Sequence, residues 1–306
     1  MRDWLVDAPT ILEFVPPPKR LGLEGLEKRL RHLERLLDQH PFSAINLPEI
    51  REEESRSALG ERTTPYEPRF SAREIALEIR QRFAIPAIVN HVVARQSATD
   101  LSHWLRETHD RFQVEDFVLV GPARGNAERI GPSVPEANEI LRSVLPGNVT
   151  VGNICIPGRR SGGIEEADRM EQKATVGVDF FTTQIVYHST PCVELLDTIA
   201  RRCPRAALTP ILVSLCPLRR AESIGFLRWL GVELDELTAQ RLTRDRDHVL
   251  ERSIQHLVAV WRKICEGVER AEVVTPLGLN IAPVGPMPAS ATVRLAQALA
   301  SPITEL

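Results

Sequence analysis

The chain of 306 residues is poor in aromatic side chains and has no strong excess of charge of either sign. Aromatic residues make up 5% of the sequence, too few for a platform on which the bases of a single-stranded nucleic acid would stack. The formal net charge is −3, whereas a general nucleic-acid binder carries an excess of lysine and arginine. We therefore expect no nucleic-acid partner.

Cysteine is sparse, and long apolar runs are lacking. The five cysteines form no Cys-x-x-Cys pair, so we expect reduced thiols without a disulfide framework or a zinc site. No apolar run approaches the roughly 20 residues that cross a bilayer, and the N-terminus lacks the apolar core of a signal peptide. These absences predict a cytoplasmic protein with no membrane partner. No exposed apolar stripe is evident either, which favours a monomer.

Short apolar segments of strand composition alternate with amphipathic helical patterns along the whole chain. The candidate strands cover residues 10–15, 44–47, 87–94, 116–120, 149–154, 179–186, 208–215 and 277–282. This alternation is typical of parallel strands with helical crossovers. Eight such units, with a first turn rich in proline rather than glycine, predict a single (β/α)8 barrel over residues 1–306 and not an open sheet.

The helical patterns have clearer boundaries than the strands. Leucines 26, 30, 33 and 37 form one apolar stripe, and helices are expected between residues 99 and 112 and from about 236 to 268. Ser71 followed by Glu74 predicts a capping box that opens a helix over residues 72–83. The charged stretch 50–70 lacks periodicity, and we expect either a lid or a disordered loop there.

Glu13 lies in the first apolar segment, directly before Pro16-Pro17-Pro18. Proline cannot donate to a sheet ladder, so the strand must end there, and barrel enzymes hold their chemistry at strand C-termini. Between Leu12 and Phe14 the carboxylate would lose hydration, which raises its pKa toward that of a proton donor. The alternative is a solvated glutamate at the rim of the barrel.

Other polar residues also fall at the predicted strand ends. They are Asn46, Glu49, Asn90, His91, Arg124, Asn153, Gln184, Tyr187, Ser214 and Asn280. Carboxylate and amide side chains together can satisfy the donors and acceptors of an amino-pyrimidinone ring. No His-x-x-x-His pattern, Gly-x-Ser-x-Gly elbow or P-loop is present, so we predict no catalytic metal and no nucleophilic serine.

Two motifs resemble methylenetetrahydrofolate reductase: Glu13-Phe14-Val15-Pro16-Pro17 and Gly177-Val178-Asp179-Phe180-Phe181-Thr182-Thr183-Gln184. Weaker similarities follow in the same order at residues 71–74, 85–91 and 212–218. The resemblance implies a folate substrate, with Glu13 as the acid that protonates the folate while its five-membered ring opens. It implies that Gln184 binds the pterin and helps to place the hydride donor, and that His91 ends the third strand at the same site. A structural histidine bonded to a neighbouring carbonyl is the alternative for His91.

The loops supply further candidate residues. We choose Glu49 as a second carboxylate of the folate site because it lies nearest to the end of the second strand, with Glu52, Glu53 and Glu54 left open. Asn153, at the end of the fifth strand, is a further candidate for substrate binding.

The chain departs from the family where flavin would bind. Gly121-Pro122-Ala123-Arg124-Gly125 replaces an Arg-Gly-Asp turn, and Ile156-Pro157-Gly158-Arg159-Arg160-Ser161 replaces a Tyr-Pro-Glu-x-His-Pro pattern. We therefore predict a reductase without tightly bound FAD. In it, NADH or NADPH gives its hydride directly to the opened folate. Gly121, Arg124 and Arg159 are the candidate cofactor-binding residues. The alternatives are an FAD-dependent reductase, a barrel enzyme that uses Glu13 as a base on a small carbonyl compound, and a non-catalytic folate-binding barrel.

Overall fold

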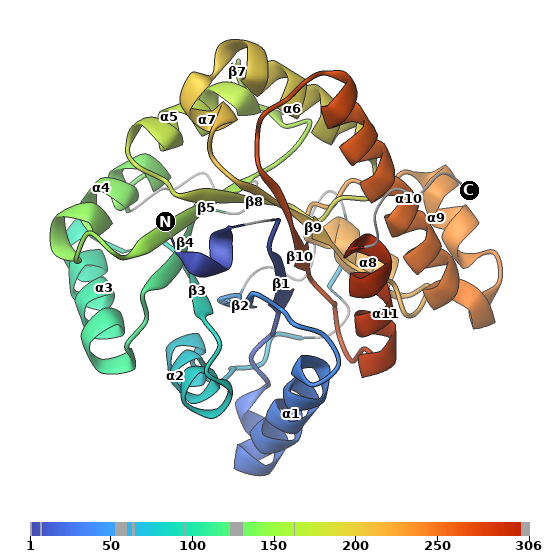
Figure 1. Cartoon of the computed structure of the whole chain (residues 1–306). Helices are drawn as coiled ribbons and strands as arrows, with labels where there is room; N and C mark the ends of the chain where they lie inside the picture. The colour runs from blue at the N-terminus through green and yellow to red at the C-terminus, as the bar shows by residue number, and fades with distance from the viewer. Residues whose placement is uncertain are drawn as a thin grey trace.

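The structure is a computed structural model that describes residues 2–6, 8–52, 60–62, 65–94, 96–122, 131–161 and 163–300. Eight parallel strands close into a barrel in the order β1-β10-β9-β8-β5-β4-β3-β2, which confirms the predicted (β/α)8 fold (Figure 1). The strands are β1 (Thr10–Glu13), β2 (Ala44–Leu47), β3 (Ala87–Val92), β4 (Asp116–Val120), β5 (Thr150–Cys155), β8 (Phe180–Thr183), β9 (Ile211–Leu215) and β10 (Leu277–Ile281). A short hairpin of β6 (Arg160–Ser161) and β7 (Ile164–Glu165) follows β5.

Helices surround the strands as an outer ring (Figure 1). They are α1 (Gly22–Leu37), α2 (Ala72–Phe83), α3 (Ala98–Phe112), α4 (Val134–Val144), α5 (Glu166–Thr175), α6 (Ser189–Arg202), α7 (Pro204–Ala207), α8 (Ser223–Trp229), α9 (Glu236–Thr243), α10 (Val249–Arg270) and α11 (Ala289–Ala300). Three short 3-10 turns, η1 (Asp3–Leu5), η2 (Lys19–Leu21) and η3 (Arg246–His248), complete the order. Among the described residues, no helix has the length and apolarity that crossing a membrane would require.

Two helix predictions were wrong in detail. The long helix expected over residues 236–268 is divided into α9, η3 and α10, because the side chain of Asp245 accepts a hydrogen bond from the backbone N–H of Asp247 and so starts a new turn. Ser71 is the N-cap of α2, but its side chain makes no capping bond. Capping boxes form instead at the starts of α3 and α4, around Ser97 and Ser133.

The lower part of the barrel interior is apolar and closed. One inward-facing residue from each of six strands forms this layer: Ile11, Ala44, Ile88, Val118, Phe180 and Leu212. The side chains of Trp4 and Leu5, from η1, pack beneath them. The Trp4 ring meets the Phe180 ring edge-on, with 5.3 Å between centroids, and its indole N–H donates to Asp116 Oδ1 at 3.0 Å. The N-terminal turn therefore plugs the barrel at the end where the strands begin.

Candidate active site at the C-terminal mouth of the barrel

A polar layer lies directly above this apolar layer. Side chains alternate along a strand, so the next inward-facing residue is two positions further along each strand. Six of these residues are polar: Glu13, Asn46, Asn90, Thr182, Ser214 and Asn280. Val120 and Ile154 occupy the same level on β4 and β5 and pack against the apolar layer. The mouth is therefore polar around most of its circumference, and it lies at the end where barrel enzymes carry out their chemistry.

Glu13 is the last residue of β1, at the position predicted from the prolines that follow it. Burial raises the pKa of its carboxyl group to about 7. Hydrogen bonds from Asn280 and Asn46 oppose this effect without cancelling it; the Asn46 Nδ2 lies 3.4 Å from Glu13 Oε2. A carboxyl group with this pKa exists as both acid and base near neutral pH, which suits proton transfer.

Three asparagines in the polar layer carry unpaired acceptors. The Oδ1 atoms of Asn46, Asn90 and Asn280 are buried and have no hydrogen-bond partner within the described part of the chain. The amide of Asn280 donates to Ser214 Oγ at 3.1 Å, and Ser214 Oγ lies 3.2 Å from the Thr182 hydroxyl. A buried acceptor without a donor costs about 1–3 kcal/mol, so these oxygens favour a ligand that presents N–H or O–H groups.

Gln184 follows β8 and is half-buried at the same end of the barrel as Glu13. Its Nε2 donates to the carbonyl of Leu230 at 3.0 Å, and its Oε1 accepts from the N–H of Ile185 at 2.8 Å. The two residues that carry the family resemblance therefore share the C-terminal mouth. In this structure both polar atoms of the Gln184 amide form hydrogen bonds within the protein.

Glu49 and His91 contact each other beside the polar layer. His91 Nδ1 lies 3.0 Å from Glu49 Oε2, which also accepts from the Val92 N–H at 2.7 Å. Burial alone would raise the pKa of Glu49, but the hydrogen bonds and charge of His91, the Val92 N–H and Arg51 together lower it. The His91 ring is buried and stacks on Trp104 with 3.6 Å between centroids. His91 therefore faces the helices, while its neighbour Asn90 faces the interior.

Asn153 also lies outside the polar layer. Its Oδ1 accepts from the amide of Asn138 on α4 at 2.8 Å, and its Nδ2 donates to the Leu119 carbonyl at 3.2 Å. The side chain is fully buried between β5 and α4. Its hydrogen bonds join sheet to helix, so we remove Asn153 from the candidate substrate contacts.

Two of the three predicted cofactor-binding residues, Gly121 and Arg159, lie in the described part of the chain, after the neighbouring strands β4 and β5. Arg159 Nε donates to Glu166 Oε2 at 2.6 Å, and Glu166 is buried, so this guanidinium is already engaged. Gly121 follows β4, where an added Cβ would meet only Val134 at an ordinary distance. Arg124, Glu53 and Glu54 lie outside the described residues. No group of three or more His, Cys, Asp or Glu side chains that could hold a metal ion occurs within the described residues.

Parts of the loop after β2 connect distant sides of the mouth. Residues 65–70 run beside the prolines that follow β1, with the Phe70 N–H donating to the Pro17 carbonyl at 3.1 Å. The guanidinium of Arg62 lies over the rings of Tyr66 and Trp229, at 5.6 and 5.4 Å. Because Trp229 ends α8, this loop joins the segments that follow β1 and β9. The rest of the expected lid, residues 53–59 and 63–64, lies outside the described residues.

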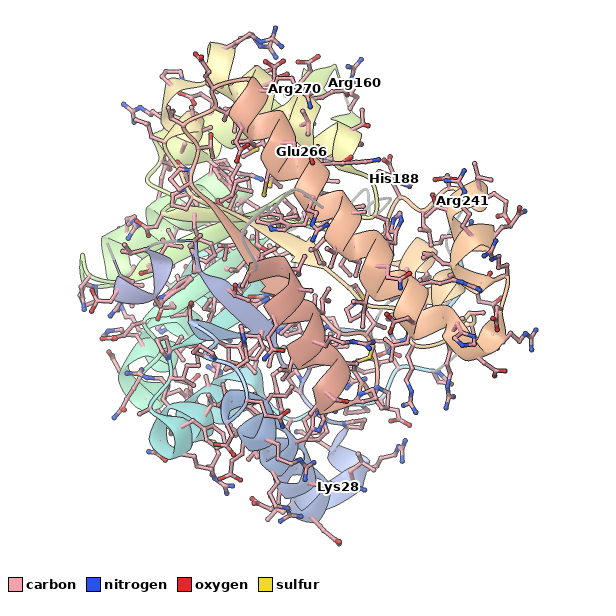
Figure 2. The ribbon with its side chains drawn as sticks, turned by 45° about the vertical axis from the view of Figure 1, so that its right-hand side comes forward. Lys28, Arg160, His188, Arg241, Glu266 and Arg270 are labelled. Carbon is pink, nitrogen blue, oxygen red and sulfur yellow. The ribbon has the colours of Figure 1, made fainter. Side chains whose placement is uncertain are left out.

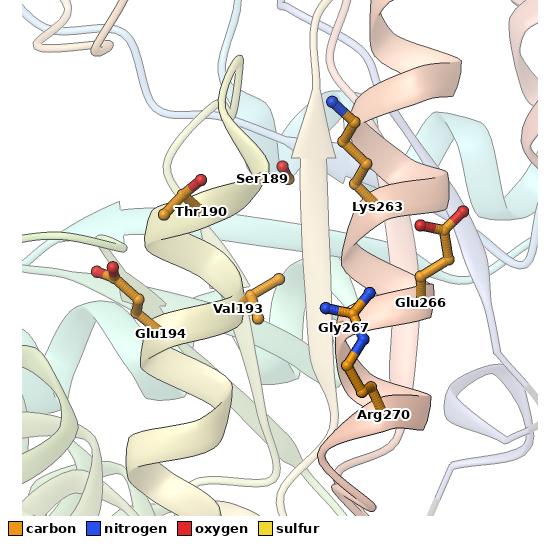
Figure 3. Close-up of a pocket in the computed structure, with 8 residues that line it drawn as sticks. All are labelled: Ser189, Thr190, Val193, Glu194, Lys263, Glu266, Gly267 and Arg270. Carbon is orange, nitrogen blue, oxygen red and sulfur yellow. The ribbon is translucent and has the colours of Figure 1, made fainter.

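Two of the cavities between described residues bear on the site, and one of them adjoins the polar layer. A cavity of about 250 Å³ lies between the segments that follow β1, β2 and β3 and has Asn90 in its wall. The other, of about 350 Å³, is an open groove between α6 and α10 (Figure 3). It lies on the outer ring of helices, where Glu266 and Arg270 of α10 are exposed (Figure 2). The first cavity and the mouth form the candidate site, because the groove between α6 and α10 contains none of the strand-end polar groups.

Neither a protein-family model nor a curated protein sequence matches the chain. The fold and site define the chain as a (β/α)8 barrel protein with a carboxylate-bearing polar mouth. Among solved structures it is similar to an uncharacterised protein from Clostridium thermocellum that binds two copies of 5-methyl-5,6,7,8-tetrahydrofolic acid. That match has a TM-score of 0.73 and 18% identity, and it covers 95% of this chain and 94% of the other.

Two further solved structures are less similar. The spore cortex-lytic enzyme SleL of Bacillus cereus matches with a TM-score of 0.51 and 15% identity, over 95% of this chain and 74% of the enzyme. A Xanthomonas albilineans dihydropteroate synthase complex matches with a TM-score of 0.48 and 15% identity, over 97% and 94%. At these identities, the matches with TM-scores of 0.73 and 0.51 show the barrel fold alone.

Proposed function

We propose that the polar mouth binds the pterin of a reduced folate and that the protein reduces 5,10-methylenetetrahydrofolate to 5-methyltetrahydrofolate. The observation that carries this proposal is the Glu13 carboxyl group, whose pKa is raised to about 7 within a layer of asparagine amides. The solved structure from Clostridium thermocellum, which binds 5-methyltetrahydrofolate, supports the choice of ligand because it has the same fold over nearly the whole chain.

The polar layer suits the pterin ring chemically. A pterin edge presents an amino group and a ring N–H as donors, and a carbonyl as an acceptor. The free Oδ1 atoms of Asn46, Asn90 and Asn280 can accept from the donors. The hydroxyls of Thr182 and Ser214 can turn to donate or accept, so the layer can satisfy both kinds of group on one ring.

Glu13 would act as the acid in the first step. In the substrate, one carbon atom bridges two nitrogens, N5 and N10. Protonated Glu13 gives its proton to N10 as the bond between N10 and the carbon breaks, which leaves an iminium cation at N5 and a carboxylate on Glu13. The carboxylate then stabilises the nearby cation. Hydride addition to the carbon gives the methyl group, and Glu13 regains a proton from water.

The hydride would come from NADH or NADPH as co-substrate. Of the candidate cofactor-binding residues, Arg159 is engaged by Glu166 and Arg124 lies outside the described residues. We therefore give no protein residue a role in the hydride transfer. The absorbance spectrum of the purified protein separates a flavin-free reductase from an FAD-dependent one.

The test is a reduction assay with methylenetetrahydrofolate and either NADH or NADPH, in which dihydronicotinamide consumption and 5-methyltetrahydrofolate formation are both measured. Consumption should require the folate, and E13Q should lower the rate by about 100-fold or more. The matched control is E139Q, which changes an exposed glutamate of α4 and should leave the rate unchanged. No folate-dependent consumption with either donor would overturn the reductase assignment.

A non-catalytic folate-binding barrel is the second candidate, and the description of the Clostridium thermocellum protein as a folate binder favours it. Calorimetric titration with 5-methyltetrahydrofolate distinguishes the two. Binding without any turnover under the assay conditions would support the binding protein. Binding together with E13Q-sensitive turnover would support the enzyme.

A further inference from the structure

We infer that the cavity beside the mouth is a subsite for the benzoylglutamate tail of the folate. This inference rests on the proposed function, because it names the part of the ligand that leaves the polar layer. The cavity is lined by Pro16, Pro48, Glu49, Ile50, Tyr66, Arg69, Phe70, Ser71, Ala72, Arg73, Val89, Asn90 and Trp104. Asn90 belongs to both the cavity wall and the polar layer, so a ligand seated in the layer can extend into the cavity.

The walls of the cavity suit an aromatic ring. Tyr66, Phe70 and Trp104 contribute ring surfaces, and Pro16 and Pro48 contribute flat apolar ones. The position of Trp104 is fixed by its stacking on His91. Flat apolar walls of this kind favour an aromatic group of a ligand. The aminobenzoyl ring is the part of a folate that matches them.

Arg69 supplies a cation to this cavity. Its Nη1 donates to the Pro16 carbonyl at 2.6 Å, while its buried Nε has no hydrogen-bond partner among the described residues. Among the described residues, no carboxylate forms an ion pair with the Arg69 guanidinium. The nearby Glu67 is paired with Arg20 at 2.7 Å. A partly buried guanidinium that no carboxylate of the described residues pairs with favours a carboxylate ligand.

The electrostatics around Arg69 point the same way. Burial lowers the pKa of Arg69 first, and the charge of Arg62 lowers it further, while Glu67 and Tyr66 partly oppose this effect; two cations therefore lie close together. A bound carboxylate would relieve their repulsion. The other charged groups in the lining are already paired: Glu49 with Arg51 at 2.9 Å, and Arg73 with Glu107 at 2.7 Å. Among the described residues of this lining, Arg69 is therefore the charged group that remains to receive an anion.

The volume of the cavity suits the tail of a folate and not the whole molecule. Its volume of about 250 Å³ lies below the usual range of roughly 300–1,000 Å³ for a site that encloses a whole drug-sized ligand. A benzoylglutamate group, which is one ring with a short chain that carries two carboxylates, fits this volume better than a complete dinucleotide. The pterin would occupy the barrel mouth, and the tail would occupy the cavity.

Arg69→Gln separates the subsite from the pterin site. Calorimetry should compare 5-methyltetrahydrofolate with 6-methyltetrahydropterin, which lacks the tail. We expect R69Q to weaken binding of the folate by about 10- to 100-fold, the range for loss of a charge-assisted contact, and to leave the tailless pterin unchanged. Arg69→Lys, which keeps the charge but has fewer donors, should show a smaller loss, and its circular dichroism reports whether the loop still folds. The matched control is R106Q, an exposed arginine of α3.

Each outcome supports or overturns the tail subsite, and the two ligands distinguish its failure from a failure of the proposed function. An equal loss for both ligands in R69Q, or no loss for either, overturns the tail subsite. If neither pterin binds, the proposed function fails, and p-aminobenzoylglutamate alone then decides the subsite by ligand-detected NMR. Binding of that fragment to the wild type and its loss in R69Q supports the subsite, and no binding overturns it. If inorganic phosphate or NADH displaces the fragment and R69Q weakens NADH rather than folate, the cavity belongs to a phosphate-bearing ligand and the inference is overturned.

Discussion

Glu13 on β1 and Asn46 on β2 are direct partners in the register of the first strand pair, and the Asn46 amide reaches the Glu13 carboxylate at 3.4 Å. This hydrogen bond is long, so it offsets only part of the effect of burial on the carboxyl group. The pair thereby combines a fixed position with a raised pKa, two properties that a proton donor needs. The first two predictions concern this group.

Stability should depend on pH through Glu13. Its carboxyl pKa is near 4.5 when unfolded and about 7 in the folded protein. Below about pH 4.5 the carboxyl group is protonated in both the folded and the unfolded state, and its contribution to the free energy of unfolding is fully present. As the pH rises from about 4.5 to 7, the folded protein must hold a partly buried, desolvated carboxylate, and the free energy of unfolding falls by at most about 3 kcal/mol. In E13Q this loss is absent.

Urea denaturation at about pH 5 and about pH 8 checks this prediction. Other groups titrate in both proteins, so the quantity to compare is the stability difference between wild type and E13Q. That difference should shift in favour of E13Q at the higher pH. A difference that stays constant across this range would show that the Glu13 pKa is unperturbed.

Asn280→Ala should raise the pKa of Glu13 above its wild-type value of about 7, because the Asn280 hydrogen bond stabilises the carboxylate. Carbon NMR of the glutamate side-chain carboxyl groups measures this titration directly and needs no activity. Ser214→Ala is the control, since it removes the partner of Asn280 on its far side and keeps the amide itself. A Glu13 pKa that falls in N280A contradicts the assignment.

Gly152→Ala should destabilise the barrel. Gly152 on β5 is the register partner of Phe180 on β8, and an added Cβ would come within 2.3 Å of the Phe180 ring. The ring also packs on Trp4, so it has little room to move. We expect a loss of about 1–3 kcal/mol in the free energy of unfolding, typical of an overpacked core. Gly147→Ala, with no atom within 4 Å of its added Cβ, should show no comparable loss.

Arg142→Ala should lower stability without affecting the mouth. Its guanidinium joins the starts of two strands, donating to the Val149 and Gly177 carbonyls and to Asp179 Oδ2, each at 2.6 Å. This end of the barrel is the one that usually serves stability rather than catalysis. We expect a loss of about 1–3 kcal/mol in urea denaturation and unchanged folate affinity. R106A is the control, and a change in affinity without a change in stability would contradict the prediction.

The barrel was predictable because its signals are local. Apolar strand composition between turn residues set β2 and β4 at their observed bounds, residues 44–47 and 116–120. The predicted strand bounds were wrong where the neighbouring segment shortens the strand. The strand expected at residues 208–215 begins only at Ile211, because α7 and Pro210 occupy the preceding positions. The strand expected at residues 179–186 ends at Thr183, since its last residues already belong to the mouth.

The site was less predictable because it depends on which face of each strand a residue occupies. Glu13 and Gln184 lie at the expected end, but His91 and Asn153 point toward the helices. The alternation of side chains along a strand predicts which residues face the interior and which face the helices. If the neighbour of His91 faces inward, His91 itself must face outward. No such local signal exists for Arg69, whose position depends on a loop folding against the prolines after β1.

The turn that carries Trp4 packs beneath the apolar layer, so in the described part of the chain the polar layer is reached from the C-terminal mouth. Two reactants that meet at this layer must pass through the same entrance. Whichever molecule sits deeper arrives first and departs last, so a reaction between them would follow a compulsory order of binding. Product inhibition patterns would then reveal which of the two lies nearer to the floor.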